Sequence, residues 1–131
     1  MGELKSFFKQ ISMAMKSYLN NIENRRRLKN ESLRNELKNE ALRLGRFLRN
    51  SGFKFKRLYL FGSVVKEDTP LSPWSDIDLV IEGLPQDLYY KAYGLLIRTA
   101  KFYIDFKPFE ELNEELKARL KREGVVIYEA R

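Results

Sequence analysis

The sequence has no cysteine and no histidine among its 131 residues. Without cysteine it can form neither disulfides nor thiolate metal sites. Without histidine it has no imidazole base and no Ser-His-Asp triad, and most kinds of zinc site are excluded. Any acid–base chemistry must therefore use carboxylate, lysine or tyrosine side chains.

Long apolar runs are also missing, although 44% of the residues are hydrophobic, enough for a real core. No run approaches the ~20 apolar residues that a membrane-spanning helix needs. The first residues, MGELKSFFKQ, lack the apolar stretch of a signal peptide. We therefore expect a cytoplasmic protein with no membrane partner.

Positive charge is concentrated in the first part of the chain. Residues 1–57 contain fifteen Lys or Arg and five Asp or Glu. Residues 58–131 contain ten Lys or Arg and thirteen Asp or Glu. Such a basic segment favours an acidic partner protein, a polyanionic substrate or nucleic acid, and it is equally consistent with a solvated helix face. Nucleic acid has the weakest support, because the aromatic residues here occupy packing positions.

Apolar residues recur at helical spacing over the first fifty residues. The first stripe predicts a helix over residues 3–22, and it consists of Leu4, Phe7, Phe8, Ile11, Met15, Tyr18, Leu19 and Ile22. Three asparagines within residues 20–24 predict a bend or break. A second stripe continues to about residue 50, where Ser51-Gly52 is a helix stop. Because the first stripe needs a partner surface, we expect this helical extension, residues 1–52, to contact a second copy or a partner protein.

Residues 53–131 alternate between strand-like and helical patterns. The patterns predict strands over residues 55–61, 77–82, 102–107 and 125–128, and helices over 63–67, 86–100 and 113–123. This alternation predicts an α/β domain, with helices packed against a small mixed sheet.

A Gly-Ser turn followed by an acidic pair is the most informative motif. Gly62-Ser63 ends one apolar strand, and Asp76-Ile77-Asp78 begins the next. Side chains alternate along a strand, so both carboxylates project from one face, where they repel and raise each other's pKa. Mg²⁺ relieves such a conflict, and it is usually held by one or two carboxylates together with substrate phosphates. The turn suits a phosphate, because glycine allows close backbone approach and free N–H groups attract anions.

This constellation resembles the minimal nucleotidyltransferases (MNT proteins) of the DNA polymerase β-like superfamily. The family signature is Gly-Ser, a loop, then Asp-x-Asp, with a third carboxylate on a later strand. Asp105 in FYIDFKPFEEL would supply that carboxylate, and LKREGVVIYEA is similar to the family's final helix, glycine turn and strand. The resemblance covers about residues 55–129 and implies a nucleotidyltransferase domain over residues 53–131. From the residues alone, Asp105 could instead face solvent or pair with Lys107.

The resemblance implies an enzyme that transfers a nucleoside monophosphate to a hydroxyl acceptor. ATP or another nucleoside triphosphate would place its β- and γ-phosphates at Gly62 and Ser63, with Lys66 as a further phosphate contact. Asp76, Asp78 and Asp105 would be the catalytic residues and would hold one or two Mg²⁺ ions. The family also implies an antitoxin role beside a helical HEPN-type toxin, with AMP transferred to a toxin tyrosine.

Two other functions stay open. One is a non-catalytic partner that binds nucleotide or protein, because Val64-Val65 follows the Gly-Ser pair where the family often has basic residues. The other is a small-molecule adenylyltransferase of the aminoglycoside type, although those enzymes usually carry a further C-terminal helical domain, which this sequence lacks.

Overall fold

The computed structural model describes residues 2–131 and groups the chain into two compact units. The first unit ends at Ser32, and the second runs from Leu33 to Arg131. The N-terminal helix α1 (Gly2–Asn50) contributes residues to both units. The second unit thus begins earlier than the boundary expected at residue 52, because the last turns of α1 belong to its core.

The bend or break expected near residues 20–24 is not present, since α1 is continuous from Gly2 to Asn50. Asparagine is only a mediocre helix former, costing about 0.7 kcal/mol or less relative to alanine, whereas glycine and proline cost more. Residues 3–44 contain neither glycine nor proline. The three asparagines were therefore too weak a signal to end the helix.

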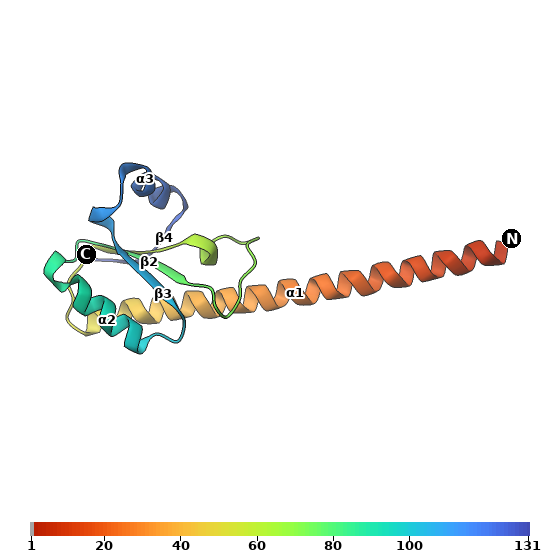
Figure 1. The fold of residues 1–131 in the computed structure, drawn as a ribbon, viewed down its shortest axis with the longest axis horizontal. Helices are drawn as coiled ribbons and strands as arrows, with labels where there is room; N and C mark the ends of the chain where they lie inside the picture. Colours follow the sequence, from red (N-terminus) through yellow and green to blue (C-terminus); the bar gives the residue numbers. More distant parts are fainter. Residues whose placement is uncertain (1) are drawn as a thin grey trace. The chain divides into compact units, whose positions relative to one another are not determined.

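The second unit is built on a four-stranded mixed sheet, as the sequence predicted (Figure 1). The strand order is β3-β2-β1-β4, in which β2 and β3 are parallel and the other neighbours are antiparallel. The strands are β1 (Arg57–Phe61), β2 (Ile77–Glu82), β3 (Ile104–Pro108) and β4 (Val125–Glu129). The prediction for β2 was confirmed to the residue.

The helices of this unit also follow the predicted order. They are α2 (Tyr89–Thr99) and α3 (Glu114–Glu123), and Asn113 caps α3 by accepting a 2.8 Å hydrogen bond from Leu116 N. The short helix expected over residues 63–67 is present as a 3₁₀ helix, η1 (Gly62–Val65), and two further 3₁₀ helices precede α2 and α3, η2 (Gln86–Leu88) and η3 (Phe109–Glu111). Within residues 2–131, no helix is both long enough and apolar enough to cross a membrane.

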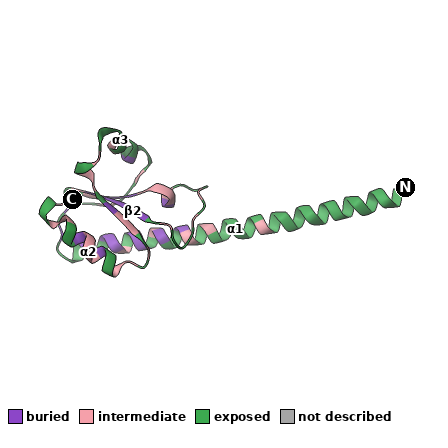
Figure 2. Ribbon diagram, viewed as in Figure 1, coloured by how far each residue is buried: buried purple, intermediate pink, exposed green. Residues whose placement is uncertain are grey.

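The two faces of the sheet are covered differently (Figure 1). On one face, residues 33–50 of α1 and helix α2 pack on alternate strand residues such as Leu58, Leu60, Leu79 and Ile81. On the other face, a smaller cluster joins Tyr59 and Val80 to Leu120 of α3. Figure 2 shows burial concentrated in the strands and the last turns of α1, whereas residues 2–21 are exposed.

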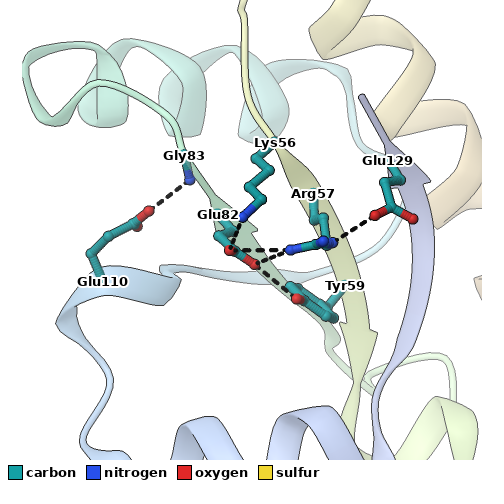
Figure 3. A network of polar contacts seen from close by, with 7 residues as sticks. All are labelled: Lys56, Arg57, Tyr59, Glu82, Gly83, Glu110 and Glu129. Carbon is teal, nitrogen blue, oxygen red and sulfur yellow. Dashed lines mark hydrogen bonds and ion pairs between the residues drawn. The ribbon is translucent and has the colours of Figure 1, made fainter. Parts of the chain in front are cut away.

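A polar network joins β1, β2 and β4 (Figure 3). Arg57 forms ion pairs with Glu82 at 3.4 Å and with Glu129 at 2.9 Å, and the Tyr59 hydroxyl donates to Glu82 at 2.8 Å. Burial by itself would raise the pKa of Glu82, but the Tyr59 hydrogen bond and the charges of Lys56 and Arg57 outweigh it and lower that pKa. The network therefore ties the three strands together with Glu82 ionised at neutral pH.

A pair of leucines tests whether the end of α1 is part of the core. Leu44 is fully buried, whereas Leu42 on the same helix is exposed. We expect Leu44→Ala to lower the free energy of unfolding by about 2–5 kcal/mol, because it leaves a cavity in a packed core. The control Leu42→Ala should cost less than about 1 kcal/mol. Urea unfolding measures both, and equal small losses would mean that residues 33–50 are not a core element.

Candidate nucleotidyl-transfer site

The site begins where β1 turns into η1. Phe61 is paired with Asp78 in the antiparallel β1–β2 register, so the turn and the acidic strand meet side by side. Gly62 has a φ of +83°, a left-handed conformation that side-chain-bearing residues rarely adopt. A Cβ atom at this position would lie 2.2 Å from Asp78 Oδ2. Only glycine therefore fits between the turn and the carboxylate.

Asp105 joins the site from the other side of β2. The parallel β2–β3 register pairs Asp78 with Asp105. Asp76 immediately precedes β2, whose first residue, Ile77, donates its backbone N–H to Tyr103 O at 2.8 Å. Gly62 directly follows β1, Asp78 and Asp105 lie on the adjacent strands β2 and β3, and Asp76 enters at the same end. The structure brings together the turn and the three carboxylates that the sequence singled out.

Electrostatics at this end of the sheet are unfavourable for an ionised Asp78. Burial raises the pKa of Asp78 to about 6, and the charges of Asp105 and Asp76 push it in the same direction, while Lys107 opposes them. An ionised Asp78 is therefore costly in free energy. A bound cation would remove that cost, so the donor set fits Mg²⁺, which prefers carboxylate and phosphate oxygens.

The carboxylates do not converge on one point in this structure. Residues 2–131 contain no group of three or more Asp, Glu, His or Cys side chains arranged to hold a metal ion. Asp105 instead forms an ion pair with Lys107, whose Nζ lies 3.1 Å from its Oδ2. Asp76 is exposed, whereas Asp78 and Asp105 are half-buried. The fit to Mg²⁺ therefore rests on the chemistry and order of the donors.

The loop after the turn is held by a residue that the sequence analysis missed. Arg34 of α1 is only 5% exposed and donates three hydrogen bonds to backbone carbonyls of this loop. Its Nε reaches Val64 O at 3.1 Å, and its Nη2 reaches Lys66 O at 2.5 Å and Thr69 O at 2.8 Å. Charged groups donate roughly twice as strongly as neutral ones. The guanidinium thus fixes the path of the loop between the turn and Asp76.

Lys66, the expected phosphate contact, is positioned through its backbone. Its N–H donates to Ser63 O at 3.2 Å, which closes η1, and its carbonyl accepts from Arg34. Its side chain is exposed, and its charge helps to lower the pKa of Glu123, after the larger effect of the Arg119 hydrogen bond. The ammonium group therefore lies within electrostatic range of α3 as well as next to the turn.

Two exposed aromatic side chains flank the acidic residues. Trp74, two residues before Asp76, lies with its ring centre 6.1 Å from that of Tyr103, two residues before Asp105. They line a cavity of about 540 Å³ together with Ile97 and other residues at the end of α2. The sequence does show an aromatic residue two positions before each motif, but only the β2–β3 register reveals that they meet.

The family assignment follows from the sequence match. The family described as polymerase beta, nucleotidyltransferase, matches residues 43–131, more than half of the chain. This chain belongs to that nucleotidyltransferase family. The resemblance inferred from Gly62-Ser63, Asp76-x-Asp78 and Asp105 is thereby confirmed at the level of the family. The matched region includes the last turns of α1, in agreement with their place in the core.

Three solved structures share this fold. One is a toxin–antitoxin with AMP-PNP, at 20% identity and TM-score 0.54, covering 71% of this chain and 73% of that one. Two are mutants of the toxin–antitoxin MntA-HpeT. The first has 16% identity and a TM-score of 0.53, and the match covers 68% of this chain and 72% of that one. The second has 20% identity and a TM-score of 0.52, and the match covers 72% of this chain and 73% of that one. At these identities the likeness shows the fold. No curated protein sequence matches the chain.

The pKa of Asp78 predicts how the stability of the metal-free chain depends on pH, measured in the presence of a chelator such as EDTA. Because its pKa is about 6 in the folded chain and near 3.8 when unfolded, the folded state binds more protons between these values. Stability therefore falls as pH rises from about 4 to about 6. Above this window, Asp78→Asn should be more stable than the wild type by roughly 1–2 kcal/mol, allowing for solvent around a half-buried group.

Urea unfolding across this pH range gives the measurement. The gain of Asp78→Asn should shrink as pH falls through the window, whereas Asp87→Asn, an exposed carboxylate on η2, should show little difference from the wild type. A gain for Asp78→Asn that does not change with pH would contradict a buried, ionisable Asp78.

Proposed function

We propose that the chain transfers a nucleoside monophosphate, AMP from ATP, to a hydroxyl group of a partner protein. The observation that supports this most strongly is the close contact of the Gly62 turn with Asp78, which in turn is paired in register with Asp105. In a nucleotidyltransferase domain, a phosphate-binding turn and carboxylates at one end of the sheet provide the parts that phosphoryl chemistry needs. The membership of the family gives the reaction class.

The roles follow from what each group can do. The N–H groups of the turn at Gly62 and Ser63 would hold the β- and γ-phosphates. Asp76 and Asp78, with Asp105, would hold Mg²⁺, which when bound neutralises charge on the phosphates. Asp105 would accept the proton of the acceptor hydroxyl. The hydroxyl oxygen forms a bond to the α-phosphorus, the bond from that phosphorus to the bridging oxygen breaks, and pyrophosphate leaves.

The ion pair between Asp105 and Lys107 has a place in this scheme. Both side chains are partly exposed, so the pair contributes little stability and opens easily. Lys107 offsets part of the negative charge that Asp105 places on Asp78. When a cation neutralises the carboxylates, Lys107 would be free to turn to a phosphate oxygen of the nucleotide. The pair would then not block the site.

The partner is proposed from the structural neighbours. All three are toxin–antitoxin structures, and one of them is described with AMP-PNP. We infer that this chain acts as an antitoxin, with a toxin protein, a HEPN-type toxin by the family resemblance, as its partner and AMP acceptor. The acceptor would be the side-chain hydroxyl group of a tyrosine or serine of that protein.

Three observations favour a second function. Asp105 pairs with Lys107, and the described residues hold no ready metal-ligand group. Both fit a non-catalytic partner subunit, as does the Val64-Val65 pair after the turn. The two experiments below separate this alternative from the enzyme.

Binding of ATP is the first test. We expect calorimetry to show ATP binding that is at least about tenfold tighter in Mg²⁺ than in EDTA, because the carboxylates repel uncompensated phosphate charge. The double variant Asp76→Ala/Asp78→Ala should lose the metal-dependent part. Asp87→Asn, on η2, is the control and should bind as the wild type does. Equal ATP binding with and without Mg²⁺ would exclude the proposed site.

Transfer is the second test, with α-³²P-labelled ATP and the protein encoded by the neighbouring gene as the acceptor. Asp105→Asn should lower the transfer rate by roughly 10²–10⁴-fold, the range for a lost acid–base group. It should keep the melting temperature, since the two side chains have nearly the same shape. A wild-type protein that binds Mg²⁺-ATP but labels nothing would favour the non-catalytic partner. Wild-type rates in Asp105→Asn would assign that residue a structural role only.

A further inference from the structure

The first unit carries an apolar stripe that nothing in the described chain covers. Its exposed members are Leu4, Phe7, Phe8, Ile11, Met15, Tyr18 and Leu19, and Ile22 at its end is half-exposed. A stable interface takes about 800 Å² from each partner, and eight large apolar side chains, three of them aromatic, provide surface of that order. The size of the stripe therefore matches a specific interface.

The spacing of the stripe is that of a coiled coil. Leu4, Phe8, Ile11, Met15, Tyr18 and Ile22 alternate in steps of four and three, which keeps them on one seam of the helix. Such a seam packs against another helix of the same repeat rather than against a sheet. The positions beside the seam, residues 5, 7, 12, 14, 19 and 21, contain a single charged side chain, Lys5.

The stripe is also symmetrical about residue 13. Leu4 and Ile22 lie equally far from it, and so do Phe7 and Leu19, Phe8 and Tyr18, and Ile11 and Met15. This symmetry follows from the seam spacing, which reads the same in both directions. An antiparallel pair centred on residue 13 therefore brings every seam residue opposite another apolar residue of the second copy.

Charge selects the antiparallel arrangement over the parallel one. Arg25, Arg26, Arg27 and Lys29 follow the stripe. In a parallel pair these four cations would lie beside their own copies and repel, whereas in an antiparallel pair centred on residue 13 they lie at opposite ends. The small residues Ser12 and Ala14, next to the axis, permit close approach there.

We propose that residues 4–22 form an antiparallel two-helix coiled coil with the same segment of a second copy, centred on residue 13. Each seam residue packs against its mirror position, so the contact closes on itself as a dimer. The seam is about 27 Å long, at 1.5 Å of rise per residue. This pairing does not depend on the proposed transfer activity.

A matched pair of variants in the full chain tests the dimer. Ile11 lies in the seam, whereas Met13, two residues along, is 61% exposed and lies outside it. We expect the wild type to sediment with twice the chain mass of 15.6 kDa. Ile11→Glu should raise the dissociation constant of the dimer at least ~100-fold, because each copy would bury an unpaired charge in the seam. Met13→Glu, with the same change of charge, should remain a dimer.

Two outcomes would overturn the dimer. One is a wild type with the mass of a single chain at about 100 µM, and that result would leave the stripe to a different protein. The other is equal dissociation of Ile11→Glu and Met13→Glu. The melting temperature of the second unit should be the same in both variants, which excludes a global loss of folding as the cause.

Disulfide trapping tests the orientation, and the chain suits it because it contains no cysteine. A mixture of Leu4→Cys chains and Ile22→Cys chains should form a mixed disulfide on oxidation, since these positions face each other in the antiparallel pair. Leu4→Cys alone should trap little dimer, because its two sulfurs would lie near opposite ends of the seam. Efficient trapping by Leu4→Cys alone would show a parallel pair and overturn the proposal.

Discussion

The close contact between Gly62 and Asp78 is the constraint on which the rest of the site depends. Asp78 Oδ2 occupies the space that a Cβ at residue 62 would need, so the turn and the carboxylate can meet only because residue 62 is glycine. The contact holds a carboxylate where burial and two like charges raise its pKa to about 6. A fold selected for stability alone has no reason to keep such a group. The cation proposed for this end of the sheet would offset that cost.

The second unit offsets this cost with ordinary packing and one strong polar anchor. Residues 33–50 of α1 bury a row of leucines against the sheet, and Gly45 lets the helix come close to Leu58. From the same helix, Arg34 donates hydrogen bonds to three backbone carbonyls of the loop between η1 and β2 and so holds that loop in place. The helix thus serves as both core element and loop support. The family match begins within α1, at residue 43, so it includes the end of this core helix but not Arg34.

The sequence predicted the order of elements and the site motif because both rest on local patterns. Alternating apolar residues marked β2, and the acidic pair was visible beside it. Arg34 was missed because its acceptors are backbone carbonyls thirty or more residues away, and any sequence provides carbonyls. The role of residues 33–50 was missed for a related reason, since a helical stripe shows which face is apolar and not what it packs on. The short helix predicted at residues 63–67 lies at residues 62–65, because a single turn carries no periodicity that marks its bounds.

The excess of positive charge extends across the division between the two units at residue 32. The first fifty-seven residues carry a large excess of cations, whereas the rest of the chain is slightly acidic, although it is the part proposed to bind a polyanionic nucleotide. Within that acidic part, the carboxylates cluster at the turn and only Lys66 and Lys107 lie near them. A site of this composition repels ATP by itself and attracts it once divalent cations neutralise the carboxylates. At the proposed site, nucleotide binding would therefore depend on the cation.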